Sequence, residues 1–105
     1  MPRYVFQMQV RNGEKERLLR LNEEYADVLN RAGKAIVGLH RVEKYLFEDQ
    51  YVDLIDFDGE FEEFSHQLTA DPDVRQFLRS VNSCFVHSLS EMTSREMACI
   101  QTLGE

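Results

Sequence analysis

The sequence has few cysteines and no long apolar run, and both absences narrow its class. Cys84 and Cys99 are the only cysteines, and their spacing fits neither a metal site nor a redox motif, so we expect reduced, structural thiols. No stretch approaches the ~20 apolar residues that a membrane span needs. Met1–Val10 alternates between polar and apolar residues and does not form the apolar run of a signal peptide. These features predict a cytoplasmic protein.

Basic residues are also scarce. Twelve Lys and Arg stand against 19 Asp and Glu, for a formal net charge of −7. Such a surface repels a phosphate backbone, so a nucleic-acid partner is not expected. The sequence contains no Gly-rich phosphate loop, serine nucleophile elbow or Cys–His pair of recognisable spacing. Its three histidines lack the spacing of metal ligands, and we predict no metal site.

The composition that remains is that of one small globular domain spanning residues 1–105. Hydrophobic residues make up 43% and charged residues 30% of the chain. A domain of this size buries roughly 60–70% of the surface that its unfolded chain exposes. A large cavity is therefore a heavy demand on so small a core, and dimerisation is the usual remedy.

Hydrophobic periodicity predicts alternating strands and helices. Arg3–Val10 alternates and predicts a half-buried strand. Apolar residues then recur at helical spacing over about 14–32, with Gly33 as the expected C-terminal cap. The later predicted elements are strands at Ile36–Phe47 and Tyr51–Phe57, a short helix with Phe61, Phe64 and Leu68 on one face, a helix capped by Asp71 with Pro72 at its first position, and a last strand within about Glu96–Leu103.

This order, β-α-β-β-α-(α)-β, predicts a ferredoxin-like α+β fold, an antiparallel sheet with helices on one face. The strand at 51–57 is apolar on both sides, with Tyr51 and Ile55 on one and Val52 and Leu54 on the other. Two sheets packed face to face would bury the second side. We therefore predict a homodimer, in the form of a dimeric α+β barrel.

Two runs in the middle of the chain resemble a known family. Gly38–Phe47 and Tyr51–Gly59 resemble the small aromatic-polyketide cyclases of the tetracenomycin type and the related SchA/CurD-like proteins of spore-pigment clusters. Ala70–Phe77 looks like the helix start of that family. The likeness covers roughly residues 35–85 and consists of strands and turns rather than a catalytic signature.

The resemblance implies dimers that direct aldol ring closure and dehydration of a poly-β-ketone intermediate, without a metal or organic cofactor. The implied substrate is either free or bound to a carrier protein. Where those cyclases place a histidine after the hairpin, within Leu-Tyr-x-His-Leu-Ile, this chain has Asp53. His40 and Arg41 match only part of the family's basic pair.

The residues themselves suggest an acid–base site. Asp53 shares a strand face with Tyr51 and Ile55, where burial would raise its pKa into the range of a general base; the alternative is an arginine partner or an exposed position. His40 is either an acid–base group or a surface histidine, and His66 lies either in the pocket or at its rim. The predicted catalytic residues are Asp53, His40 and His66, and the predicted substrate-binding residues are Tyr51, Arg41, Tyr45 and Phe64.

Three functions fit this pattern. The first is a cofactor-independent polyketide cyclase. The second is a cofactor-free monooxygenase that oxidises an aromatic polyketide on the same kind of barrel. The third is a non-catalytic dimeric module that binds a small apolar ligand or another biosynthetic protein, and a solid interface between sheet and helices would favour it.

Overall fold

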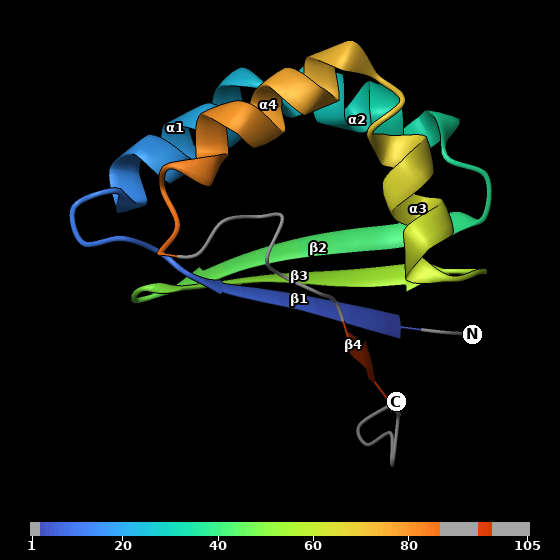
Figure 1. The fold of residues 1–105 in the computed structure, drawn as a ribbon, viewed down its shortest axis with the longest axis horizontal. Coiled ribbons are helices and arrows are strands. Elements are labelled where there is room, and N and C mark those ends of the chain that lie inside the picture. Colours follow the sequence, from blue (N-terminus) through green and yellow to red (C-terminus); the bar gives the residue numbers. More distant parts are fainter. Residues whose placement is uncertain (1–2, 87–94, 98–105) are drawn as a thin grey trace.

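A computed structural model describes residues 3–86 and 95–97 and shows helices on one face of a sheet (Figure 1). Its elements are β1 (Arg3–Gln9), α1 (Lys15–Glu24), α2 (Ala26–Ala35), β2 (Leu39–Phe47), β3 (Gln50–Phe57), α3 (Phe61–Leu68), α4 (Pro72–Asn82) and β4 (Arg95–Met97).

The strands form one four-stranded sheet in the order β2-β3-β1-β4, and every neighbouring pair is antiparallel. This order confirms the predicted ferredoxin-like α+β fold. Among the helices of the described residues, none is long and apolar enough to cross a membrane.

Alternation along the strands divides the core into two clusters. Met8 of β1 lies opposite Tyr51 of β3, and both belong to a cluster closed by α1 and α4. Tyr4 lies opposite Ile55, and both belong to a second cluster with Phe64 of α3. The strand positions between these two rows hold the pair Phe6 and Asp53, so a carboxyl group lies between the two apolar clusters.

The predicted helix over 14–32 is two helices, because the chain breaks at Tyr25. This residue has φ −98° and ψ 10°, and its ring packs on Phe77 of α4 at 5.4 Å between centroids. The prediction that Gly33 caps the helix is wrong, since α2 runs on to Ala35. The left-handed turn falls at Gly38 instead, with φ 90°.

Two strand boundaries also differ from the prediction. The strand expected from Ile36 begins at Leu39, because Ile36 ends α2 and is buried in the core. The last strand, expected within Glu96–Leu103, is seen as β4 and pairs with β1; residues 98–103 lie outside the described part of the chain.

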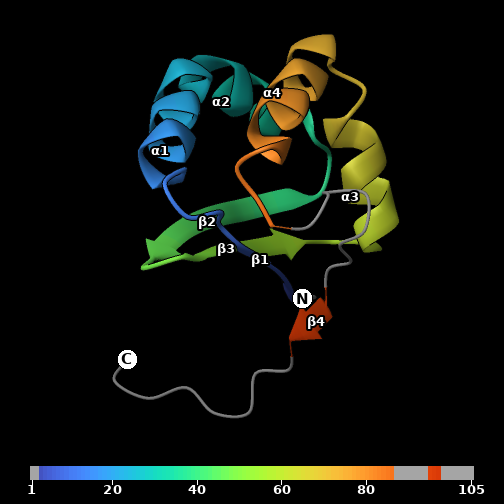
Figure 2. The same cartoon turned by 60° about the vertical axis from the view of Figure 1, so that its left-hand side comes forward.

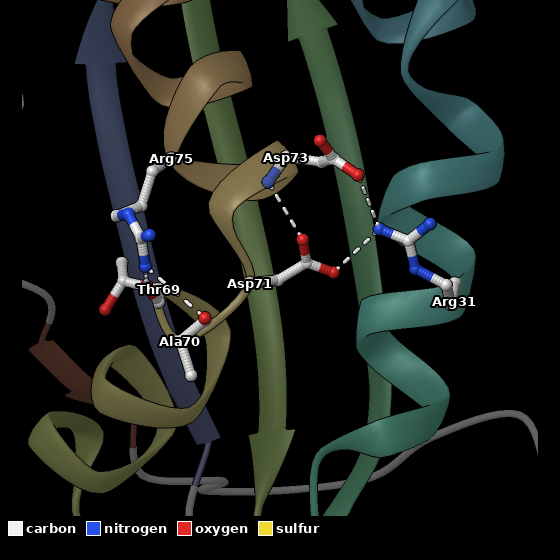
Figure 3. A network of polar contacts seen from close by, with 6 residues as sticks. All are labelled: Arg31, Thr69, Ala70, Asp71, Asp73 and Arg75. Carbon is white, nitrogen blue, oxygen red and sulfur yellow. Dashed lines mark hydrogen bonds and ion pairs between the residues drawn. The ribbon is translucent and has the colours of Figure 1, made fainter.

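Polar contacts tie α2 to the start of α4 (Figure 3). Asp71 caps α4 as predicted, since its carboxylate accepts the backbone N–H of Asp73 at 2.9 Å. Arg31 of α2 reaches both Asp71 (2.8 Å) and Asp73 (3.1 Å). The bond from Arg31 is the main cause that lowers the pKa of Asp71. These contacts join two of the helices that cover the sheet.

Candidate active site

A cavity of about 840 Å³ lies between the sheet and the helices. Residues of β1, β2 and β3 form its floor, and residues of α1, α2, α3 and α4 form its roof. Figure 2 shows these helices on one side of the sheet. The walls are mainly apolar, with Leu18, Leu29, Ile55, Phe64 and Phe77 among them. A mainly apolar pocket with few polar groups is typical of a small-molecule site.

Asp53 lies on the floor of this cavity, as the alternation of β3 predicted. In the strand register, Asp53 lies opposite Phe6 of β1 on one side and opposite Lys44 of β2 on the other. Its Oδ1 atom is buried and has no hydrogen-bond partner among the described residues. Desolvation raises the pKa of Asp53, while the charge of Lys44 and the Tyr51 hydroxyl act in the opposite direction with smaller effect. A carboxyl group of this kind is suited to accept a proton near neutral pH.

Tyr51 lies on the same face of β3, two positions before Asp53, and lines the cavity. Its ring is buried against Phe85, at 5.4 Å between centroids. Burial, followed by the charge of Asp53, raises the pKa of the Tyr51 hydroxyl above its ordinary value. The hydroxyl therefore stays protonated and acts as a hydrogen-bond donor beside the carboxyl group.

Lys44 of β2 lines the cavity and was not among the predicted site residues. Its ammonium donates to Oδ1 of Asn22 at 3.2 Å and lies 5.2 Å from the centre of the Phe77 ring. Desolvation lowers the pKa of Lys44, and the charge of Asp53 partly offsets this. The residue as a whole keeps an exposed surface, because β2 is an edge strand of the sheet. Alternation of Val42, Lys44 and Leu46 was the signal that could have placed it on the helix side.

His40 and Arg41 lie at the rim of the cavity. The register shifts between Leu39 and Arg41, so the strand is irregular at His40. His40 Nε2 lies 2.7 Å from Oδ2 of Asp58, and the side chain is 45% exposed. Arg41 is engaged with Glu43 at 2.6 Å. Both residues therefore border the cavity, but each already has a carboxylate partner.

The structure does not bring His66 or Tyr45 to the cavity. His66 is exposed on α3, because two residues along a helix do not share a face and Phe64 occupies the inner one. Tyr45 lies on the opposite face of the sheet, where its hydroxyl donates to Glu43. Phe64 is buried in the cavity wall and packs on Phe57. Of the seven predicted site residues, Asp53, Tyr51 and Phe64 thus lie inside the cavity.

The described residues hold no group of three or more His, Cys, Asp or Glu side chains placed to bind a metal ion. Cys84 is a free, buried thiol, as the sequence predicted. Burial is the main cause that raises its pKa, so it is a poor nucleophile. Cys99 lies outside the described residues.

Comparisons with solved structures support the fold. A protein of Bordetella bronchiseptica, provisionally assigned as an antibiotic biosynthesis monooxygenase, superposes with a TM-score of 0.67 at 13% identity, over 95% of this chain and 97% of the other. A Nitrosomonas europaea protein with the same provisional assignment gives 0.70 at 7% identity, over 96% and 100%. An L-rhamnose mutarotase of Formosa agariphila gives 0.66 at 11% identity, over 97% and 98%.

No protein-family model matches the sequence, and no curated protein matches it. At these identities the solved structures establish a shared fold, and proteins of different activity share it. The resemblance to polyketide cyclases therefore stays a prediction.

Proposed function

We propose that this protein is a cofactor-independent enzyme that removes a proton from an aromatic polyketide intermediate, with Asp53 as the base. The observation that carries the proposal is the Asp53 carboxyl group, which belongs to the lining of an apolar cavity and whose buried Oδ1 atom has no hydrogen-bond partner among the described residues. A base that must receive a proton needs such an uncommitted oxygen atom. The flat aromatic walls suit a polycyclic substrate.

Oxygenation is the reaction that we favour after this proton transfer. A carbon that has lost its proton next to a carbonyl group is rich in electrons and can reduce O₂ while forming a carbon–oxygen bond. Loss of water then turns a CH₂ group into a carbonyl group, so one O₂ is consumed and one water is released. The provisional assignment of several structural neighbours as antibiotic biosynthesis monooxygenases supports this outcome.

Aldol cyclisation is the second candidate, because it begins with the same proton transfer. The strand and turn pattern over residues 35–85 favours it, and a cavity of about 840 Å³ has room to fold a flexible chain upon itself. Bringing two ends of one chain together can lower the barrier by up to ~7–11 kcal/mol in ideal cases. A solid interface between sheet and helices would have favoured the non-catalytic module, and this interface is hollow.

We further propose that the enzyme works as a homodimer joined through the uncovered face of the sheet. Figures 1 and 2 show the helices gathered on one side. The other side carries Val5, Val52, Leu54 and Tyr45, and Tyr45 is 50% exposed. A second copy would cover these apolar side chains.

The proposal is tested with the products of a minimal polyketide synthase under isotopically labelled O₂. Products that gain one labelled oxygen and lose two hydrogens indicate oxygenation, whereas a new ring pattern at constant oxygen count indicates cyclisation. Asp53→Asn should lower turnover by about 10²–10⁴-fold, because the amide accepts no proton. Asp27→Asn, at an exposed position in the first turn of α2, is the matched control. Unchanged turnover in Asp53→Asn would remove this residue as the base.

A further inference from the structure

Lys44 and Asp53 are opposite charges on directly paired strand positions that make no ion pair. They are register partners on β2 and β3, and both line the cavity. Side chains at such positions start about 4.5–5.5 Å apart at Cβ. The described residues form several ion pairs with N–O distances of up to 4.0 Å, and none of these pairs joins Lys44 to Asp53. The ammonium of Lys44 and the carboxylate of Asp53 thus belong to the same cavity but do not form an ion pair with each other.

The position of the ammonium is set by two helices. Asn22 of α1 donates from its Nδ2 to the Leu18 carbonyl oxygen at 2.9 Å, which turns its Oδ1 toward Lys44. Phe77 of α4 offers the face of its ring to the same ammonium. A lysine ammonium has three N–H donors, and Asn22 uses one. The remaining donors are available to a ligand in the cavity.

We propose that Lys44 binds the negatively charged oxygen that forms when Asp53 takes a proton, so that the cavity selects 1,3-dicarbonyl and phenolic compounds that give stable enolates. The proposal rests on the function proposed above. In the step, the C–H bond breaks, the proton passes to the Asp53 carboxylate, and the bonding electron pair moves onto the carbonyl oxygen. That oxygen then accepts an N–H of Lys44.

Charge balance favours this arrangement. Before the step the cavity holds the Lys44 cation and the Asp53 anion. After it, Asp53 is neutral and the negative charge lies on the ligand, so the total charge in the cavity does not change. A fixed donor aimed at the oxygen where charge develops is an effective stabiliser in a site with little water. Two other basic lining residues differ, because His40 pairs with Asp58 and Arg41 with Glu43, and the third, Lys34, lies on α2.

The test measures binding, which is independent of turnover. The probes are 4-hydroxycoumarin, an enolate at neutral pH, and 4-methoxycoumarin, which has the same ring frame without the negative oxygen. Isothermal titration calorimetry on the full chain should show that Lys44→Met lowers the affinity for 4-hydroxycoumarin by about tenfold or more. Binding of 4-methoxycoumarin should change by less than about threefold. Lys44→Arg, which keeps a positively charged N–H donor, should retain more enolate binding than Lys44→Met.

Lys34→Met is the matched control, since Lys34 also lines the cavity but lies on α2. Three outcomes would each overturn the assignment. Lys44→Met could lose the same affinity for both probes, Lys34→Met could lose as much affinity for 4-hydroxycoumarin as Lys44→Met, or the wild-type protein could fail to bind 4-hydroxycoumarin. Thermal unfolding of each variant separates lost binding from lost structure. Asp53→Asn should keep or improve enolate binding, because it removes a negative charge beside the ligand. If its turnover is unchanged, the proposed base fails while the result on Lys44 stands.

Discussion

Asp53 is a carboxyl group placed where the flanking residues of β3 contribute to apolar clusters. Tyr51 and Ile55, on either side of it along the same face, are 7% and 3% exposed. A charge in such surroundings costs free energy unless it is paired, and the neighbouring Lys44 directs its ammonium to Asn22 instead. A position that is unfavourable for stability and favourable for proton transfer is typical of a functional site.

This balance predicts that Asp53→Asn stabilises the protein at neutral pH. Burial raises the pKa of Asp53 in the folded state above its value in the unfolded chain. Protonated Asp53 therefore contributes its full stabilisation below the pKa of the unfolded state, about 4. This stabilisation is lost as the pH rises through the pKa of the folded state. Asparagine has no such proton to lose. We expect a melting temperature higher by about 4–8 °C at neutral pH, the shift that ~1 kcal/mol produces in a small domain.

Denaturant unfolding of both proteins across the acid range checks this prediction. The gain should shrink as the pH falls and should vanish below about 4, where Asp53 is protonated in both states. The acid end of the series is thus the internal control. A variant that is less stable than the wild type at neutral pH would contradict the assigned environment of Asp53.

The alternation of single residues predicted part of the site. A period of two places Tyr51, Asp53 and Ile55 on one face, and the structure agrees. The role of Lys44 was not predictable from β2 alone, because it depends on Asn22 and Phe77, which reach it from helices far along the chain. Periodicity also left the face of His66 open, and the helix settles it by turning Phe64 inward.

At the scale of elements, the cavity exists because the helices cover the sheet in short segments. The break at Tyr25 divides the first helical region, and both α1 and α2 contribute lining residues. Arg31 then ties α2 to the capped start of α4. The roof is thus assembled from four helices held by a few side-chain contacts, and the floor is the continuous sheet.

Two glycines near the end of α2 provide a stability test of this description. Gly33 lies inside α2, and a Cβ atom there would meet only Leu39 at 3.9 Å, an ordinary contact. We expect Gly33→Ala to stabilise the fold by ~0.5–1 kcal/mol, because alanine is the better helix former. Gly38 has φ 90°, and Gly38→Ala should destabilise by about 1–2 kcal/mol. Denaturant unfolding of both variants gives the two values.

The two substitutions are controls for each other, since they add the same methyl group five residues apart. Destabilisation by Gly33→Ala would mean that this glycine ends the helix, as its sequence position alone suggests. Length and composition could not decide between the two glycines, because either one is an acceptable stop signal. The difference lies in Ile36, which is buried in the second core cluster and fixes where α2 must end.

At the scale of the molecule, the described helices all lie on one face of the sheet, and none of them covers the other face (Figure 1). Its charged groups are largely satisfied within the face, since Arg3 pairs with Asp56 at 2.7 Å and Arg41 with Glu43 at 2.6 Å. The apolar side chains of Val5 and Leu54, which are register partners, lie among them. A surface with internally paired charges and an apolar centre is suited to meet a copy of itself.

We therefore expect the chain of 12.4 kDa to sediment at twice this mass. Leu54→Lys, at the centre of the uncovered face, should shift the protein to a monomer, because a buried lysine opposite its own copy is desolvated and repelled. Phe47→Glu, at the exposed end of β2, should weaken the dimer as well. Val37→Glu is the matched control: Val37 is 78% exposed, more than Phe47 at 73%, but lies in the turn before β2. A dimer that survives Leu54→Lys and dissociates in Val37→Glu would place the interface elsewhere, and a monomeric wild type would contradict the assembly itself.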